Sequence, residues 1–320
     1  MAKKIFFFIS IAFFILGCVG ISFSEEYPSH EIKLLVGHPA GGGTDIVGRK
    51  LASIMEKKLG VPVVVLNKPG AAGLVALKEL VRSKPDGYKI QLSAAVLVNA
   101  PNFDKTAVSI DDIDVIAVIN SDPGVLYVPA DSPYKTLDEF FSEAKANPGK
   151  LRVAHAGVGG TSHLCILVWE LLTGAKFEKV PFRGNAEVLP AVAGGHVHAG
   201  SAEGPAAKSL MEAGKLRSLG VSGVERLPIY PDVPTFKEQG YEIVIGSIRT
   251  LVAPPGLPSN VKTRLVEAVD KTMNSEEMKE FWRKTGLMPK YKRGEDAIDW
   301  LKEQEKLASK SYSKAGIEIK

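Results

Sequence analysis

Short apolar runs alternate with stretches of helical periodicity through the first hundred residues after the amino-terminal segment. The apolar runs 32–36, 61–66 and 89–93 each have the length of a buried strand. Between them, 46–59 and 74–83 carry apolar residues every three or four positions, which is typical of helices packed by one face. Strands that alternate with helices predict an α/β fold with a mostly parallel sheet covered by helices.

The alternation returns further along the chain, after two apolar runs at 115–119 and 125–128 that we interpret as separate strands. The remaining segments expected to be regular are the strands 151–156, 196–201, 216–221 and 241–250 and the helices 137–144, 164–172, 186–192, 261–273, 276–284 and 295–310. Asn260 and Ser275 stand where the N-caps of two of the last helices are expected. We expect this helical tail to pack on the first of two domains.

Two glycine-rich stretches each lie between a predicted strand and a predicted helix. The first is His-Pro-Ala-Gly-Gly-Gly-Thr-Asp at 38–45, and the second is Gly-Val-Gly-Gly-Thr-Ser-His at 157–163. Glycine lets the backbone approach a ligand closely, and a helix start offers unpaired N–H groups with a partial positive charge. Each stretch is therefore either a seat for an anion or a tight connection that binds nothing. If two such loops faced each other across domains, they would clasp one carboxylate.

The length of 320 residues suits two domains with ample cores, and 45% hydrophobic and 24% charged residues are ordinary for a globular protein. We predict a discontinuous first domain of residues 25–126 and 228–320, and a second domain of residues 127–227. The chain would cross between them near 125–133 and 222–234.

Charge argues against a nucleic-acid partner. The formal net charge is +4, and removal of residues 1–24, which hold two lysines and no acid, leaves +2. No block rich in lysine and arginine occurs, so we expect no nucleic-acid surface.

Residues 1–24 have the pattern of an export signal, with two lysines, an apolar run and small residues before a cut near Ser24/Glu25. This predicts a periplasmic location. Cys18 offers an alternative, because the three residues before it imperfectly match a lipoprotein signal, which would leave the protein lipid-anchored at Cys18. A third alternative is an uncleaved anchor, although the apolar run is shorter than the ~20 residues that a membrane span needs. With Cys18 removed by cleavage or acylated, Cys165 would have no disulfide partner, and we interpret it as a small buried hydrophobe.

Several kinds of chemistry lack their motifs. The first glycine stretch has neither the Gly-Lys-Ser/Thr ending of a nucleotide loop nor dinucleotide spacing. Ser162 is not in a nucleophile elbow, since leucine stands at 164 where glycine is required. The histidines lack zinc-ligand spacing, so we expect no metal, no cofactor and no catalysis.

Eight ordered elements resemble one family over nearly the whole mature chain. They are the leader, Pro-Ala-Gly-Gly-Gly-Thr-Asp at 39–45, Asn-Lys-Pro-Gly at 67–70, Pro-Asp-Gly-Tyr at 85–88, Gly-Gly-Thr-Ser-His at 159–163, Val-Pro-Phe-Arg-Gly at 180–184, Pro-Asp-Val-Pro-Thr at 231–235 and Ala-Pro-Pro-Gly-Leu-Pro at 253–258. Together they resemble the substrate-binding proteins of tripartite tricarboxylate transporters, the Bug-type receptors.

The resemblance implies a two-lobed periplasmic-binding-protein fold of type II, with a cleft between the lobes. It implies a monomeric receptor that captures a small carboxylate, such as a di- or tricarboxylate, an aromatic carboxylate or an amino acid, and delivers it to a two-component membrane permease. A role as the binding partner of a sensor protein is an alternative, and an exported α/β hydrolase is a further rival.

The resemblance also assigns a ligand site to the two glycine loops. The chain departs from the family pattern at Ala202, Glu203 and Arg249, and these departures suggest where the ligand is selected. The site residues so expected are Ala40, Gly41, Gly42, Gly43, Thr44, Asp45, Gly159, Gly160, Thr161, Ser162, His163, Ala202, Glu203 and Arg249. Asp45 is expected to fix the first loop as a cap. Arg249 is either a bidentate partner for a second ligand carboxylate or an ordinary arginine. Glu203 either binds a ligand ammonium, pairs with an arginine or is solvated. Arg183 is either a site residue or an interdomain contact.

Overall fold

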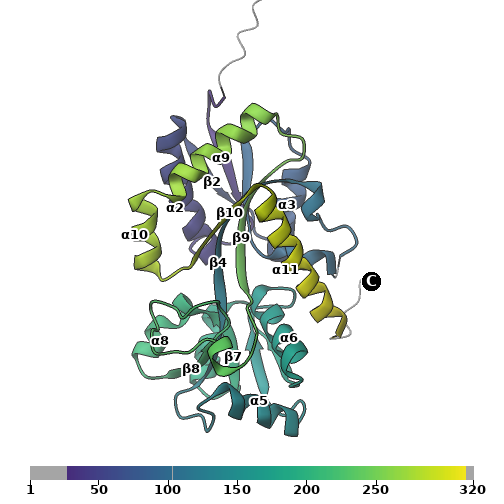
Figure 1. The fold of residues 1–320 in the computed structure, drawn as a ribbon, viewed down its shortest axis with the longest axis vertical. Coiled ribbons are helices and arrows are strands. Elements are labelled where there is room, and N and C mark those ends of the chain that lie inside the picture. Colours follow the sequence, from purple (N-terminus) through teal and green to yellow (C-terminus); the bar gives the residue numbers. More distant parts are fainter. Residues whose placement is uncertain (1–26, 103, 315–320) are drawn as a thin grey trace, which may run out of the picture.

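The structure is a computed structural model that describes residues 27–102 and 104–314. The predicted export signal and Cys18 lie outside the described residues. Two lobes are stacked along the long axis of the molecule and share one sheet of ten strands in the described part of the chain (Figure 1). The first lobe is the upper one in Figure 1 and the second lobe is the lower one.

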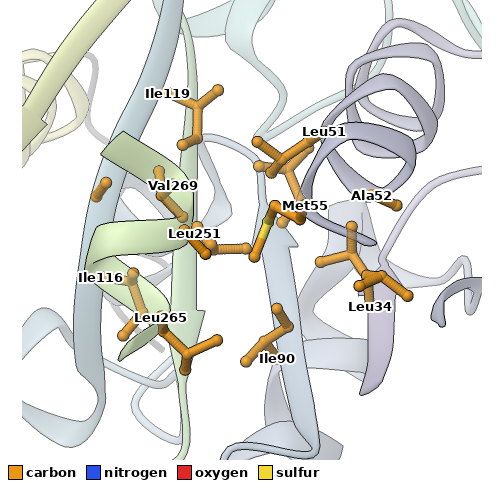
Figure 2. Close-up of a cluster of buried hydrophobic side chains, with 14 of the residues drawn as sticks. Leu34, Leu51, Ala52, Met55, Ile90, Ile116, Ile119, Leu251, Leu265 and Val269 are labelled. Atoms are coloured by element: carbon orange, nitrogen blue, oxygen red, sulfur yellow. The ribbon is translucent and has the colours of Figure 1, made fainter. Parts of the chain in front are cut away.

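The first lobe is built on three parallel strands, β1 (Ile32–Val36), β2 (Val63–Asn67) and β3 (Lys89–Ser93), in the order β2-β1-β3. Its helices are α2 (Gly43–Leu59), α3 (Leu74–Val81), α4 (Val96–Asn99), α9 (Ser259–Met273) and α10 (Glu276–Thr285). Leucine and methionine side chains from α2, including Leu51 and Met55, pack against Leu251 and Leu265, as Figure 2 shows. This cluster anchors the helix that follows the first glycine loop.

The second lobe repeats the parallel arrangement with β5 (Arg152–His155), β6 (Glu178–Pro181) and β7 (Ala199–Glu203), in the order β7-β5-β6. A further strand, β8 (Leu216–Val221), pairs with the crossing strand described below. The helices are α5 (Leu137–Ala146), α6 (Thr161–Thr173), α7 (Asn185–Ala193) and α8 (Lys208–Glu212). Aromatic side chains, among them Trp169 and Phe140, fill its core.

Long antiparallel strands connect the lobes. β4 (Asp114–Pro129) pairs with β9 (Gly246–Ala253) as far as Pro123, and from Gly124 onward it pairs with β7 and β8 (Figure 1). The two separate strands expected at 115–119 and 125–128 are therefore one strand that changes partners at Pro123. β10 (Pro289–Arg293) also pairs with β4, and α11 (Gly294–Lys314) follows it.

The connection back to the first lobe lies near the start of β9. The segment between β8 and β9 packs on the second lobe, because Phe236, Ile243 and Ile245 belong to the same core as Trp169. The domain boundaries given above stay a prediction, but this packing favours a return crossing at Gly246 rather than before residue 235.

Local signals placed most helix ends. Gly60 and Gly174 end α2 and α6 in left-handed conformation, and the Ser275 side chain accepts the N–H of Met278 at the start of α10. The expected Asn260 cap is wrong, since α9 begins at Ser259 directly after Pro258, which fixes a dihedral suited to a helix entry. Short 3₁₀ turns η1 (Ala71–Gly73), η2 (Ala100–Asn102), η3 (Ile110–Asp112), η4 (Gly204–Ala207) and η5 (Lys237–Gln239) complete the described elements.

Candidate ligand-binding site

Both glycine stretches follow parallel strands and open long helices, as the sequence predicts. The first connects β1 to α2, which begins at Gly43, and the second connects β5 to α6, which begins at Thr161. Gly42 and Gly160, the residues before each helix, have nearly the same extended dihedrals, with φ of −75° and −77°. The two loops thus present helix starts of the same geometry.

Asp45 fixes the first loop from inside the helix. Its Oδ2 accepts the N–H of Gly41 and the Nε of Arg49, both at 2.9 Å, and its Oδ1 accepts Nδ2 of Asn67 at 2.8 Å. Burial opposes the ionisation of this carboxyl, but these hydrogen bonds outweigh burial and hold the pKa of Asp45 below its usual value. Gly41 takes φ of +80°, which glycine adopts without strain.

The second loop is held by its own helix as well. The N–H of Ala156 donates to Oγ of Ser162 at 2.9 Å, and the N–H of Gly159 donates to Nδ1 of His163 at 3.3 Å. The ring of His163 stacks on His155 with centroids 4.6 Å apart. Burial, with the neighbouring His155 and Lys179, lowers the pKa of His163 to about 4, so its ring is neutral and accepts at Nδ1.

Each helix start keeps N–H groups that no described residue accepts. From the start of α2 at Gly43 onward, the first N–H with an acceptor is that of Ile46, which donates to the carbonyl of Gly42. In α6 the corresponding bond runs from Leu164 to Gly160. Within the described residues, the N–H groups at 43–45 and at 161–163 therefore have no acceptor. Three donors at each helix N-terminus can take a carboxylate.

A hydrogen bond between the lobes reaches the second loop. Nδ2 of Asn99, at the end of α4 in the first lobe, donates to the carbonyl of Gly159 at 3.2 Å. Asn99 is fully buried. Sequence reasoning missed this residue, because an asparagine at the end of a short apolar run carries no recognisable signal.

Arg249 lies beneath the first loop. Its side chain is 4% exposed, forms an ion pair with Asp122 of β4 and donates from Nε to Oγ1 of Thr44 at 3.3 Å. A Cβ on Gly43 would lie only 2.7 Å from Nη2 of Arg249. Arg249 therefore supports the loop, and a contact with a second ligand carboxylate stays a prediction. The side chain of Arg183 is exposed.

The loop after β2 packs against the first glycine loop. Nδ2 of Asn67 donates to the carbonyl of His38 at 3.0 Å, and a Cβ on Gly37 would lie 2.6 Å from Cα of Gly73. Ala71 and Ala72 have positive φ of 45° and 53°, an uncommon conformation that costs free energy and often occurs at binding sites. The turn at 67–70, one of the eight family elements, thus contacts the first loop through Asn67.

Ala202 and Glu203, two further residues of the expected site, are the last residues of β7 and differ in burial. Ala202 is buried in the second-lobe core, whereas Glu203 ends β7 at the carboxyl edge of the sheet and is half-buried. Cys165 is also buried, and burial raises the pKa of its thiol to about 12, which agrees with a packing role.

A family model described as the tripartite tricarboxylate transporter family receptor matches residues 47–316. The chain belongs to this family. The match contains the second glycine loop and starts two residues after Asp45. Members are substrate-binding receptors and not enzymes, so the rival hydrolase interpretation is wrong.

Relatives and solved structures agree with this assignment. A protein from Cupriavidus necator, called UPF0065 protein in gbd 5'region, is 36% identical over 92% of this chain and 90% of its own. A TctC solute-binding protein from Polaromonas, solved without ligand, is 34% identical with a TM-score of 0.78, covering 90% of this chain and 99% of its own. An R. palustris protein solved with adipate is 26% identical with a TM-score of 0.81, and the match covers 92% of this chain and 100% of that protein. The predicted two-lobed α/β fold of periplasmic binding proteins is confirmed.

The described residues offer neither a membrane span nor a metal cluster. No helix in 27–102 or 104–314 has the length and apolar character to cross a bilayer. No group of three or more histidine, cysteine, aspartate or glutamate side chains in those same ranges is arranged to hold a metal ion.

Proposed function

We propose that this receptor captures a small organic carboxylate between its two glycine loops. The observation that carries the proposal is the pair of helix starts, each with three N–H groups that have no acceptor among the described residues. Charge-assisted hydrogen bonds from such groups are shorter and stronger than neutral ones, and the helix dipoles add to the attraction of an anion. The ligand-binding residues would be those of 40–45 and 159–163.

The charges around the loops support a carboxylate that is bound by amides. Asp45 is already satisfied by Gly41, Arg49 and Asn67, so it does not repel an anion as a free carboxylate would. Arg249 adds a buried guanidinium beside Gly43 and Thr44. The R. palustris neighbour was solved with adipate, a small organic carboxylate, which supports that broad class of ligand here.

Capture would involve closure of the lobes about the strands that cross between them. We further propose that the protein is exported to the periplasm and delivers its ligand to a two-component permease of the tripartite tricarboxylate type. The family to which the chain belongs supports both points.

The binding seat can be tested by titration calorimetry against a panel of small mono-, di- and tricarboxylates. Gly43→Val and Gly160→Val each add a side chain at a helix start, and at Gly43 the new Cβ would meet Arg249. We expect each variant to weaken binding by about 100-fold, because the loss of roughly two charge-assisted hydrogen bonds costs about 3 kcal/mol.

Ala146→Val is the control, since it introduces the same valine side chain at an exposed position at the end of α5. It should bind like the wild type. Unchanged affinity in both glycine variants would refute a seat made by the two loops, and so would a panel in which no carboxylate binds.

A further inference from the structure

Glu203 lies beside the second glycine loop. β5 and β7 are parallel, with Val153 opposite Ala199 and Ala154 opposite Gly200. This register, continued by three residues, brings Glu203 level with Gly157 at the start of the loop. The carboxylate therefore stands at the same edge of the sheet as the N–H groups of α6 that no described residue accepts.

A hydrogen bond across the end of β5 fixes this position. Nδ2 of Asn185, the first residue of α7, donates to Oε2 of Glu203 at 2.5 Å. Asn185 follows β6 and Glu203 ends β7, and β5 lies between these two strands. The segment before Asn185 also borders the loop, since the N–H of Phe182 donates to the carbonyl of His155 at 2.8 Å. The two side chains thus span the base of the second loop.

Glu203 and Asn185 have spare acceptor capacity. A carboxylate offers about four acceptor positions, of which Asn185 uses one. Oδ1 of Asn185 is buried and has no hydrogen-bond partner among the described residues. A buried acceptor without a donor costs free energy, so a ligand donor placed here would relieve that cost.

The charges nearby leave the Glu203 carboxylate uncompensated. Within the described residues Glu203 forms no ion pair, whereas Arg249 is paired with Asp122 and Lys179 with Glu170. Burial lowers the pKa of His155 and of His163, so neither ring supplies a positive charge at neutral pH. The site therefore combines amide donors in its loops with the negative charge of Glu203, which no described residue pairs.

We propose that Glu203, together with Asn185, recognises a cationic amino group on the ligand. The inference rests on the proposed function, in which the glycine loops hold the ligand carboxylate. An ammonium has three donors and no acceptor, so it fits the carboxylate of Glu203 and the free Oδ1 of Asn185 at once. The preferred ligand class is then an aminocarboxylate, and by charge repulsion Glu203 discriminates against dicarboxylates that lack the amino group.

The test uses pairs of ligands that differ only by the amino group, namely glutamate against glutarate and aspartate against succinate. Calorimetry of the full mature chain should give an amino-bearing ligand that binds about 10- to 100-fold more tightly than its partner. Glu203→Gln should remove most of that preference and improve binding of the dicarboxylate. Asn185→Leu, which leaves the carboxylate in place, should reduce the preference by a smaller factor.

Glu212→Gln is the matched control, because Glu212 is an exposed carboxylate of the same lobe, paired with Lys208 on α8. It should keep the wild-type preference. Dicarboxylates that bind as tightly as their amino counterparts would overturn the role of Glu203 and leave the glycine-loop seat intact. An unchanged preference in Glu203→Gln would overturn it as well. Binding of no carboxylate at all would instead defeat the proposed function.

Discussion

At the scale of single residues, polar side chains of the expected site hold the loops in shape, as the sequence predicted for Asp45 alone. Asp45 accepts the N–H of Gly41, Ser162 accepts that of Ala156, and His163 accepts that of Gly159. Each bond ties a loop amide to a side chain of the following helix. The donors left for a ligand are therefore the N–H groups of the helix starts, held in place by these bonds.

The buried ion pair of Arg249 and Asp122 is a second residue-scale feature. Asp122 also accepts the N–H of Met288 at 2.8 Å and Nδ2 of Asn120 at 2.9 Å, so both of its oxygens are used. An ion pair buried this deeply gains stability mainly from its surrounding hydrogen bonds, and loss of either partner would leave a buried charge alone. The pair therefore connects the crossing strands to the first loop.

His163 should make stability depend on pH. Its pKa is about 4 in the folded protein and about 6.5 in an unfolded chain. Between these values the unfolded chain binds a proton that the folded protein does not, so the free energy of unfolding falls as the pH falls from 6.5 toward 4. The gap corresponds to about 3 kcal/mol at ~1.36 kcal/mol per pH unit. Above pH 6.5 His163 is neutral in both states, so none of this free energy of unfolding is lost.

Urea unfolding measured at neutral pH and again near pH 4.5 tests this expectation. His163→Gln retains an acceptor for Gly159 and should lose a large part of the pH dependence. His30→Gln, at an exposed position, is the matched control. The prediction fails if His163→Gln and the wild type lose the same free energy on acidification.

At the scale of elements, α11 joins the two lobes. Ala297 and Leu301 lie in a core of the first lobe, whereas Ala308 and Tyr312, further along the same helix, lie in the core of the second. The helix runs from one lobe down to the level of α6, as Figure 1 shows. Its last residue, Lys314, donates from Nζ to the carbonyl of Leu171 at 3.0 Å. The sequence pattern at 295–310 predicted this helix. It was expected to pack on the first domain only, whereas α11 also packs on the second lobe.

Tyr312 should be the main anchor of α11 on the second lobe. Its side chain is 1% exposed and its ring lies 6.2 Å from that of His163. We expect Tyr312→Ala to lower the free energy of unfolding by about 3–5 kcal/mol, because a buried aromatic ring is replaced by a cavity. Chemical denaturation measures this loss, with Ser313→Ala at the neighbouring exposed position as control. A loss below about 1 kcal/mol would show that the helix end is not held by this ring.

At the scale of the whole molecule, closely packed glycines mark the place where the chain passes between lobes. A Cβ on Gly246 would lie 2.0 Å from the carbonyl oxygen of Asp122, and one on Gly223 would lie 3.1 Å from Pro123. β4 changes pairing partners at the same point. The backbones there approach so closely that the relative position of the lobes depends on the absence of side chains.

Gly246→Ala should therefore disturb the arrangement of the lobes. The added methyl group cannot fit beside the Asp122 carbonyl, so we expect a loss of about 1–3 kcal/mol of stability from overpacking. Small-angle scattering should show a radius of gyration different from that of the wild type, since the crossing strands must separate. Gly184→Ala is the control, because its extended backbone directs Cβ into open space. Wild-type stability and scattering in Gly246→Ala would contradict a tight crossing.

The sequence by itself determined the local structure and the family. The alternation of strands and helices, the glycine loops at the starts of α2 and α6, and helix ends at Gly60, Gly174 and Ser275 all follow from short-range backbone chemistry. Such signals depend on residues a few positions apart, and they can therefore be read from one chain.

Only the tertiary structure decided how distant side chains meet. The contacts of Arg249 with Asp122, of Asn99 with Gly159 and of Glu203 with Asn185 join residues 18 to 127 positions apart. Each contact depends on strand order, register and the position of one lobe against the other, and no local pattern encodes these. The glycine loops were evident from the sequence, but the side chains that support them and the carboxylate beside the second loop were placed by the packing of the whole chain.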